Sequence, residues 1–275
     1  MSVENKQLNT PYYTLQYRII GKGQPVFLVH GYGEDSRIWN NQIDALSAIC
    51  QLIILDLPGS GQSVLTPKGV AEWLPELSID ELAECIHEIV HAEDLAPAVV
   101  LGHSMGGYIT LAFANHYPNH LKALGLVHST AFADTAEKKS VRLKSIEFIR
   151  QNGGYALFKT TMVNLFGESF RSSNPASVQE LVEATKAFDP QVLIAYTYAM
   201  MQRPDRSDLL RYLPQPVLFV AGPEDIAAPL TDLEQQATIP NKSYLKVMEG
   251  VGHMGMLEAP SEMNRHLSGF IQLFI

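Results

Sequence analysis

Short apolar segments recur along the chain between turn residues, and they constrain the fold more than any other feature. They are VFLVH (26–30), LIILD (52–56), AVVLGH (98–103), ALGLVH (123–128), PVLFVAG (216–222) and the more alternating YLKVM (244–248). Continuous apolar runs of this length are typical of strands buried on both faces of a parallel sheet. An earlier alternating stretch, YYTLQYRII (12–20), is typical of an antiparallel strand at the edge of such a sheet.

Helical patterns lie between these segments. Ser78 and Glu81 form a predicted capping box, and the residues after it place an apolar stripe on one helix face. A second stripe, from Met263 to Phe274, predicts a helix near the C-terminus. Because strands and helices alternate, we expect an α/β fold with a mostly parallel sheet flanked by helices on both faces.

The alternation stops between Asp134 and Tyr212. This stretch carries helical patterns, beginning with AEKKSVRLKSIEFIRQNGG, and no buried strand pattern. It holds eleven Lys and Arg against nine Asp and Glu, whereas the rest of the chain holds nine against twenty. We therefore predict a core domain made of residues 1–133 and 213–275, with residues 134–212 inserted as a helical cap.

Composition narrows the classes of partner and location. The chain has 275 residues and a net charge of −9, with no cluster of Lys and Arg, so neither nucleic acid nor an anionic membrane is an expected partner. The N-terminus lacks the apolar stretch of a secretion signal, and no apolar run is long enough to span a membrane. We expect a cytoplasmic protein. The two cysteines, Cys50 and Cys85, lie in apolar surroundings and are expected to be buried free thiols.

One pentapeptide, Gly102-His-Ser-Met-Gly106, follows the strand pattern AVVL and precedes the helical run YITLAFANHY. A serine on a sharp turn from strand to helix is lifted above the sheet edge, and small residues two positions before and after it leave room for the backbone. The positive N-terminal end of the helix also favours an oxyanion beside it. Ser104 is therefore the candidate nucleophile.

A serine needs a base, and the base needs an acid that fixes its tautomer. His253 lies between glycines after a strand pattern, on a loop that we expect to let its ring move. Asp225 directly follows the strand PVLFV and is the preferred acid, with the adjacent Glu224 as its rival. The order serine, aspartate, histidine is the order of one class of hydrolase.

Backbone donors for an oxyanion are expected on two loops. The N–H of Met105 follows the nucleophile, and the N–H of Tyr32 lies in the glycine-containing loop after VFLVH. His30 and His103 are expected to make structural hydrogen bonds near the site.

These motifs resemble those of the α/β-hydrolase superfamily, in its serine-nucleophile branch with a helical cap. The resemblance spans Tyr12 to Phe274 and is carried by four motifs: His30-Gly31, the turn from Asp56 to Ser63, the pentapeptide around Ser104, and the loop ending at Asp225 together with His253. It implies an eight-stranded sheet, a Ser104–Asp225–His253 triad, an oxyanion hole from Tyr32 and Met105, and a cap over the pocket.

The predicted activity is hydrolysis of a small or medium carboxylic ester through an acyl-enzyme on Ser104, with water as the second reactant and without a cofactor or a metal. Two alternatives stay open: C–C bond, enol-lactone or thioester hydrolysis on the same triad, and a ligand-binding, receptor-like protein with negligible turnover. Arg142 and Lys144 could receive a substrate carboxylate, but a solvated helix face is the preferred interpretation. The motifs predict neither the substrate's identity nor the oligomeric state.

Overall fold

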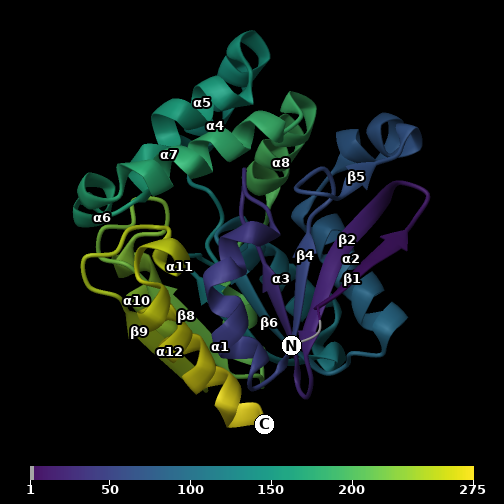
Figure 1. Ribbon diagram of the computed structural model, residues 1–275, viewed down its shortest axis with the longest axis vertical. Coiled ribbons are helices and arrows are strands. Elements are labelled where there is room, and N and C mark those ends of the chain that lie inside the picture. The colour runs from purple at the N-terminus through teal and green to yellow at the C-terminus, as the bar shows by residue number, and fades with distance from the viewer. Residues whose placement is uncertain (1–2) are drawn as a thin grey trace.

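The computed structural model describes residues 3–275, and nine strands form one sheet at its centre (Figure 1). The strands are β1 (Val3–Asn9), β2 (Tyr13–Gly21), β3 (Pro25–Val29), β4 (Gln51–Asp56), β5 (Val64–Leu65), β6 (Ala98–His103), β7 (Leu121–Val127), β8 (Val217–Ala221) and β9 (Ser243–Val247). Eight of them follow the order β1-β2-β4-β3-β6-β7-β8-β9, and β5 pairs with β2 outside this path. The predicted α/β fold with a mostly parallel sheet is confirmed.

The prediction of an edge strand at residues 12–20 is wrong in one respect. β2 is antiparallel to its neighbour β4, as expected, but β1 pairs along its other side and is the edge strand. β1 is largely exposed, and its sequence VENKQLN is correspondingly polar. It therefore lacks the apolar pattern that predicted the strands of the core. From β4 through β9 all pairings along the path are parallel.

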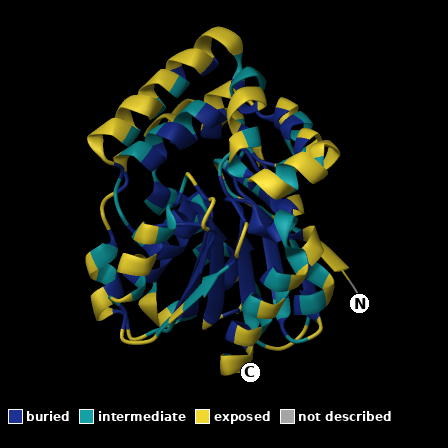
Figure 2. Ribbon diagram, turned by 90° about the vertical axis from the view of Figure 1, so that its left-hand side faces the viewer, coloured by how far each residue is buried: buried dark blue, intermediate teal, exposed yellow. Residues whose placement is uncertain are grey.

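Two apolar cores lie on the two faces of the sheet, and alternate residues of the central strands β3, β4, β6, β7 and β8 contribute to each. In β3, Phe27 and Val29 face one core, and Val26 and Leu28 face the other. Figure 2 shows the buried strands between exposed helix surfaces. Because side chains on a strand point alternately to opposite faces, continuous apolar segments are the consequence of covering both faces with helices.

The helices of the α/β layers are α1 (Ile43–Ser47), α2 (Ile79–Glu93), α3 (Met105–His116), α10 (Leu230–Ala237), α11 (Gly255–Glu258) and α12 (Pro260–Ile271). α2 and α3 cover one face of the sheet, and α1 and α12 cover the other. The capping box at the start of α2 is confirmed, because the Ser78 hydroxyl accepts from the Glu81 N–H while the Glu81 carboxylate accepts from the Ser78 N–H.

Residues 134–212, called the helical segment below, connect β7 to β8 and contain no strand. Its helices are α4 (Ala136–Asn152), α5 (Gly154–Thr161), α6 (Glu168–Ser173), α7 (Pro175–Ala184), α8 (Pro190–Gln202) and α9 (Ser207–Tyr212). Much of it lies above one end of the sheet, with α4, α5, α7 and α8 at the top of Figure 1. A third apolar cluster, which includes Ile149, Phe158 and Val182, packs these helices together.

Short helical turns complete the chain: η1 (Ser36–Gln42), η2 (Gly69–Trp73), η3 (Leu74–Glu76), η4 (Pro118–His120), η5 (Met162–Leu165), η6 (Thr185–Ala187) and η7 (Gln272–Phe274). Among the described residues no helix is both long and apolar enough to cross a membrane. Cys50 and Cys85 are buried free thiols, as predicted.

Candidate active site

Ser104 lies on the sharp turn between β6 and α3, with φ of 51° and ψ of −116°. A positive φ is unfavourable for a residue that carries a Cβ, and such strain costs about 1–3 kcal/mol. Two backbone hydrogen bonds hold the turn: the Ser104 N–H donates to the Val127 carbonyl at 3.0 Å, and the Ser104 carbonyl accepts from Gly107 at 2.9 Å. The strand–turn–helix geometry expected of the pentapeptide is thus present, with the strain placed on the serine.

The two flanking glycines are required by close backbone contacts. A Cβ on Gly102 would lie 2.1 Å from the carbonyl oxygen of Gly106, and a Cβ on Gly106 would lie 2.4 Å from that of Val29. Backbone atoms cannot yield as a flexible side chain can. The spacing of small residues around Ser104 therefore follows from steric exclusion.

His253 and Asp225 meet at the ends of neighbouring strands. Nδ1 of His253 donates to Oδ2 of Asp225 at 2.8 Å, and both side chains are buried. Burial lowers the pKa of His253, but the charge and hydrogen bond of Asp225, together with the charges of Glu34 and Glu258, outweigh burial and raise the net pKa. Burial raises the pKa of Asp225, yet the two histidines around it hold that pKa well below its usual range. Asp225 is therefore a carboxylate. It holds the ring proton of His253 on Nδ1, so Nε2 is left without a proton and can act as an acceptor.

The rival acid, Glu224, points to the helical segment instead. Its Oε2 accepts from the N–H of Glu168 at 2.7 Å. The structure thus brings Asp225 to His253 and places Glu224 on a different contact.

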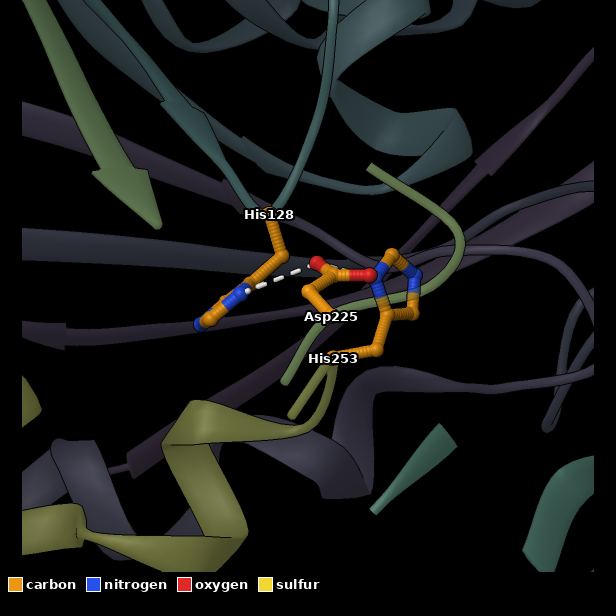
Figure 3. A group of neighbouring side chains, drawn as sticks. All are labelled: His128, Asp225 and His253. Carbon is orange, nitrogen blue, oxygen red and sulfur yellow. Dashed lines mark hydrogen bonds and ion pairs between the residues drawn. The ribbon is translucent and has the colours of Figure 1, made fainter. Parts of the chain in front are cut away.

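A second histidine contacts Asp225, and sequence reasoning missed it. Nδ1 of His128 donates to Oδ2 of Asp225 at 3.3 Å, so the carboxylate lies between two imidazole rings (Figure 3). His128 is fully buried, and burial lowers its pKa to about 4, which makes it a neutral donor. Its position directly after β7, at the same sheet edge as the other site residues, was the available signal.

His128, Asp225 and His253 are also the one group in residues 3–275 whose potential metal ligands lie within 4.8 Å of one another. Both Nδ1 atoms already donate to the carboxylate. A metal bound to those nitrogens would have to displace both protons and both hydrogen bonds. The geometry therefore fits a carboxylate hydrogen bonded to two histidines better than a metal centre.

The loop after β3 approaches Ser104 closely and is held by buried hydrogen bonds. A Cβ on Gly31 would lie 3.0 Å from the Cβ of Ser104. Oε2 of Glu34 accepts from the Gly31 N–H at 2.7 Å and from Nδ1 of His103 at 2.9 Å. Nε2 of His103 faces the His253 carbonyl oxygen at 3.0 Å. Both ring nitrogens of His103 therefore have a hydrogen-bonding partner, and the ring is held between Glu34 and the His253 carbonyl.

The two residues predicted as oxyanion donors lie in the loop after β3 and at the start of α3. Tyr32 follows Gly31 in the same loop, and its side chain lines the cavity above Ser104. Met105 is the first residue of α3, so its N–H has no hydrogen-bonding partner within the helix. His30 is structural, as predicted: its Nε2 accepts from Leu57 and its Nδ1 donates to the Gly31 carbonyl.

The loop that carries His253 is fixed at several points, contrary to the expectation of a freely moving ring. The His253 N–H donates to the Leu165 carbonyl at 2.6 Å. Glu258 accepts from the N–H groups of Gly252 and Met254 on either side, and from Gly167 of the helical segment. Glu258 is a second residue that sequence reasoning missed. The glycines permit these close backbone contacts, and a mobile loop is not needed to explain them.

Ser104 and His253 line a cavity of about 360 Å³ beneath the helical segment. Its walls include Leu157, Phe158 and Met200, which are apolar. Arg142 also lines this cavity, so the prediction that it lies on a solvated helix face is wrong. Lys144, the other residue considered with it, is exposed as expected.

The sequence pattern of the alpha/beta hydrolase fold family matches residues 24–260. This range covers most of the chain, including β3 to the start of α12. The chain belongs to the alpha/beta hydrolase fold family, and the prediction of an α/β-fold hydrolase is confirmed.

Known relatives extend over nearly the whole chain. The Pseudomonas putida dihydrolipoyllysine-residue acetyltransferase component of the acetoin cleaving system is 29% identical over 260 residues, 91% of this chain and 64% of that longer protein. The Acinetobacter baylyi (E)-2-((N-methylformamido)methylene)succinate hydrolase is 26% identical and covers 94% of both chains. A malate-bound thermophilic esterase from Thermogutta terrifontis superposes with a TM-score of 0.89 at 27% identity over 98% of both chains.

Proposed function

We propose that this protein hydrolyses small or medium carboxylic esters through an acyl-enzyme on Ser104. The observation that carries the proposal is the strained Ser104 turn, which shares one cavity with His253 while His253 is hydrogen bonded to Asp225. The esterase and hydrolase names of two of its relatives agree with this chemistry.

Acylation begins when the Ser104 hydroxyl attacks the ester carbonyl and His253 accepts the hydroxyl proton at Nε2. Asp225 stabilises the resulting imidazolium through its bond to Nδ1. The carbonyl oxygen becomes an oxyanion, which the N–H groups of Tyr32 and Met105 would stabilise. A donor of this kind contributes roughly 3 kcal/mol to the transition state. When the tetrahedral intermediate collapses, His253 returns the proton to the leaving alkoxide, and the alcohol departs.

Deacylation repeats these steps with water. His253 removes a proton from water as the oxygen attacks the acyl carbon, and the same two amides hold the second oxyanion. The proton then passes from His253 to Ser104, and the carboxylic acid leaves. Each turnover consumes one ester and one water, and Ser104 is regenerated.

The helical segment is the proposed cap. It supplies most of the cavity wall opposite Ser104, and Gly167 within it is bonded to the His253 loop through Glu258. A cavity of about 360 Å³ with largely apolar walls suits a small or medium ester.

The test combines active-site labelling with turnover. A fluorophosphonate probe should label the wild type, and p-nitrophenyl esters of rising chain length should be hydrolysed. Ser104→Ala should lose both properties, whereas Ser173→Ala, which changes an exposed serine of α6, should keep both. Ester hydrolysis by Ser104→Ala at the wild-type rate would refute the proposal.

The same experiment separates the alternatives. Labelling of Ser104 without turnover of any ester would favour C–C bond, enol-lactone or thioester hydrolysis on these residues. Failure of the probe to label Ser104 would favour a receptor-like protein.

A further inference from the structure

One face of α4 lines the cavity above Ser104, and half of that face is cationic. Lys138, Val141, Arg142 and Ser145 all line the cavity, and their spacing of three and four residues places them along a single stripe of the helix. A helix stripe that faces a largely apolar cavity is ordinarily apolar, because burying a charge without a partner is costly. The two cations therefore require an explanation.

The guanidinium of Arg142 is oriented by the protein but not fully used by it. Nε and Nη2 donate to the two carboxylate oxygens of Asp134, the former through a short bond and the latter at 3.4 Å. Nη1 has only the thioether sulfur of Met200, at 3.4 Å, as a partner among the described residues. Sulfur is a weak acceptor. The side chain is 22% exposed, so the guanidinium is largely removed from bulk water while one of its nitrogens lacks a strong acceptor.

Asp134 does not neutralise Arg142 alone. Its Oδ1 also accepts from Nη1 of Arg203 at 2.9 Å, so one buried carboxylate serves two guanidinium groups. Lys138 adds a third cation, and its Nζ donates to the backbone carbonyl of Ala227 at 3.3 Å. The ion pairs among residues 3–275 do not include Lys138. Among the described residues that line the cavity, the helical segment thus contributes two cations and no acidic side chain.

The acidic groups on the opposite side of the cavity are engaged in hydrogen bonds of their own. Glu34 is hydrogen bonded to His103 and to the Gly31 N–H, and Asp225 lies between His253 and His128. Each carboxylate is held by its own histidine partners. The wall formed by Lys138 and Arg142 is therefore the part of the cavity that suits a ligand anion.

We propose that Arg142, assisted by Lys138, forms a subsite for a carboxylate of the substrate, so that the preferred substrates are esters carrying a free carboxylate at the end of a short hydrocarbon chain. The inference rests on the proposed function, because it assigns the class of ester that Ser104 would cleave. A planar guanidinium matches carboxylate geometry, and the apolar walls contributed by Leu157 and Met200 suit the hydrocarbon between the two ends.

The test compares esters that differ in one charge. Monomethyl esters of succinate, glutarate and adipate carry the carboxylate on the acyl side, and methyl butanoate, pentanoate and hexanoate are neutral counterparts. A second series, in which carboxymethyl and propyl esters of butanoate are compared, places the carboxylate on the alcohol side. At low salt we expect kcat/KM to favour the charged ester about tenfold to a hundredfold in one of the two series, and added salt to reduce the preference.

Variants assign the preference to the subsite. Arg142→Gln should reduce the charged-to-neutral ratio of kcat/KM to near one, and Lys138→Gln should reduce it less. Arg142→Lys should restore part of it, since the charge returns without the planar fork. Arg150→Gln is the matched control, because it removes the same charge from the same helix at an exposed position, and it should retain the wild-type ratio. A wild-type ratio near one in both series, or a ratio unchanged in Arg142→Gln, would overturn the subsite.

Binding to Ser104→Ala gives a measurement that needs no turnover and covers the case in which Arg142→Gln does not fold. Calorimetry should show tighter binding of the preferred charged ester than of its neutral counterpart, and Lys138→Gln in the same background should narrow the difference. Hydrolysis of neutral esters with equal binding of both ligands would overturn the subsite and leave the proposed function intact. Preferential binding of the charged ester to a wild type that hydrolyses nothing would instead contradict the proposed function and support the subsite.

Discussion

Oδ2 of Asp225 lies 2.8 Å from Nδ1 of His253, although the two residues are 28 positions apart in the chain. Their contact follows from the sheet, because β8 and β9 are parallel neighbours and each residue lies on the loop that follows one of them. Parallel strands bring their carboxyl ends to the same edge. The hydrogen bond fixes the proton of His253 on Nδ1 and leaves Nε2 as an acceptor, to which the proposed mechanism assigns the Ser104 proton.

Replacing Asp225 by Asn tests this relationship. The amide can present its NH₂ group to Nδ1, which would put the proton on Nε2, and we expect kcat to fall about 10³- to 10⁴-fold. The carboxylate is also what raises the pKa of His253. Since the histidine must be neutral to act as a base, the acidic limb of kcat/KM against pH should move to lower pH in Asp225→Asn. A pH–rate profile measures both effects.

Glu224→Gln is the control for that substitution, because it removes a neighbouring carboxylate that contacts Glu168 instead of His253. It should leave kcat and the position of the acidic limb nearly unchanged. Equal losses in Asp225→Asn and Glu224→Gln would contradict the assignment of the acid.

His128 should make the fold sensitive to acid. Burial keeps it neutral in the folded protein down to about pH 4, whereas the ordinary histidine pKa is 6.5. Between about pH 6.5 and pH 4 the unfolded chain therefore binds a proton at His128 that the folded protein does not bind. The free energy of unfolding falls as the pH is lowered through this range. The expected loss is about 1.4 kcal/mol per pH unit.

The comparison that isolates this effect is wild type against His128→Asn, with the free energy of unfolding measured by urea denaturation at pH 7.5, 6 and 5. Asparagine tolerates the positive φ of 49° found at this position. The variant should be less stable at pH 7.5 and should lose less stability on acidification. Parallel losses in the two proteins would show that His128 is not the group responsible.

Protein stability should be sensitive to a single methyl group at Gly106, two residues after Ser104. In Gly106→Ala the new Cβ would lie 2.4 Å from the Val29 carbonyl oxygen and 2.7 Å from that of His30, so the turn between β6 and α3 must shift. We expect a loss of about 3 kcal/mol or more in stability, together with loss of the Ser104 geometry. Thermal unfolding of the purified variant provides the measurement.

Gly269→Ala is the matched control, since Gly269 lies in α12 and a Cβ there meets no atom within 4 Å. Alanine favours a helix over glycine by about 1 kcal/mol, so this variant should be as stable as the wild type or more stable. Equal destabilisation by both substitutions would argue against steric exclusion at Gly106.

The sequence predicted the features that depend on local pattern. Buried parallel strands are apolar along their whole length, and both β6 and β8 were found in this way. The turn around Ser104 was recognisable because its steric demands restrict Gly102 and Gly106 to glycine. The position of His253 and Asp225 followed from the rule that parallel strands end at one edge.

Features that depend on contacts between distant segments were not predicted. β1 is polar and pairs only along one side, so seven strand patterns were found and the eighth strand of the main path was expected only from the family resemblance. Glu34 and Glu258 act through side-chain contacts that no local pattern reveals, and for His128 the one signal was its position directly after the strand pattern of β7. Arg142 was misplaced because a charged amphipathic helix does not show whether its polar stripe faces water or a cavity.

The most direct test of the central claim is to trap the acyl-enzyme. The wild type should be mixed with p-nitrophenyl acetate, quenched in acid within the first turnovers, digested and examined by mass spectrometry. The account predicts one acetyl group on the peptide that contains Ser104, a stoichiometric burst of p-nitrophenolate, and neither signal in Ser104→Ala. Steady turnover without acetylation of Ser104, or with acetylation at another residue, would contradict it.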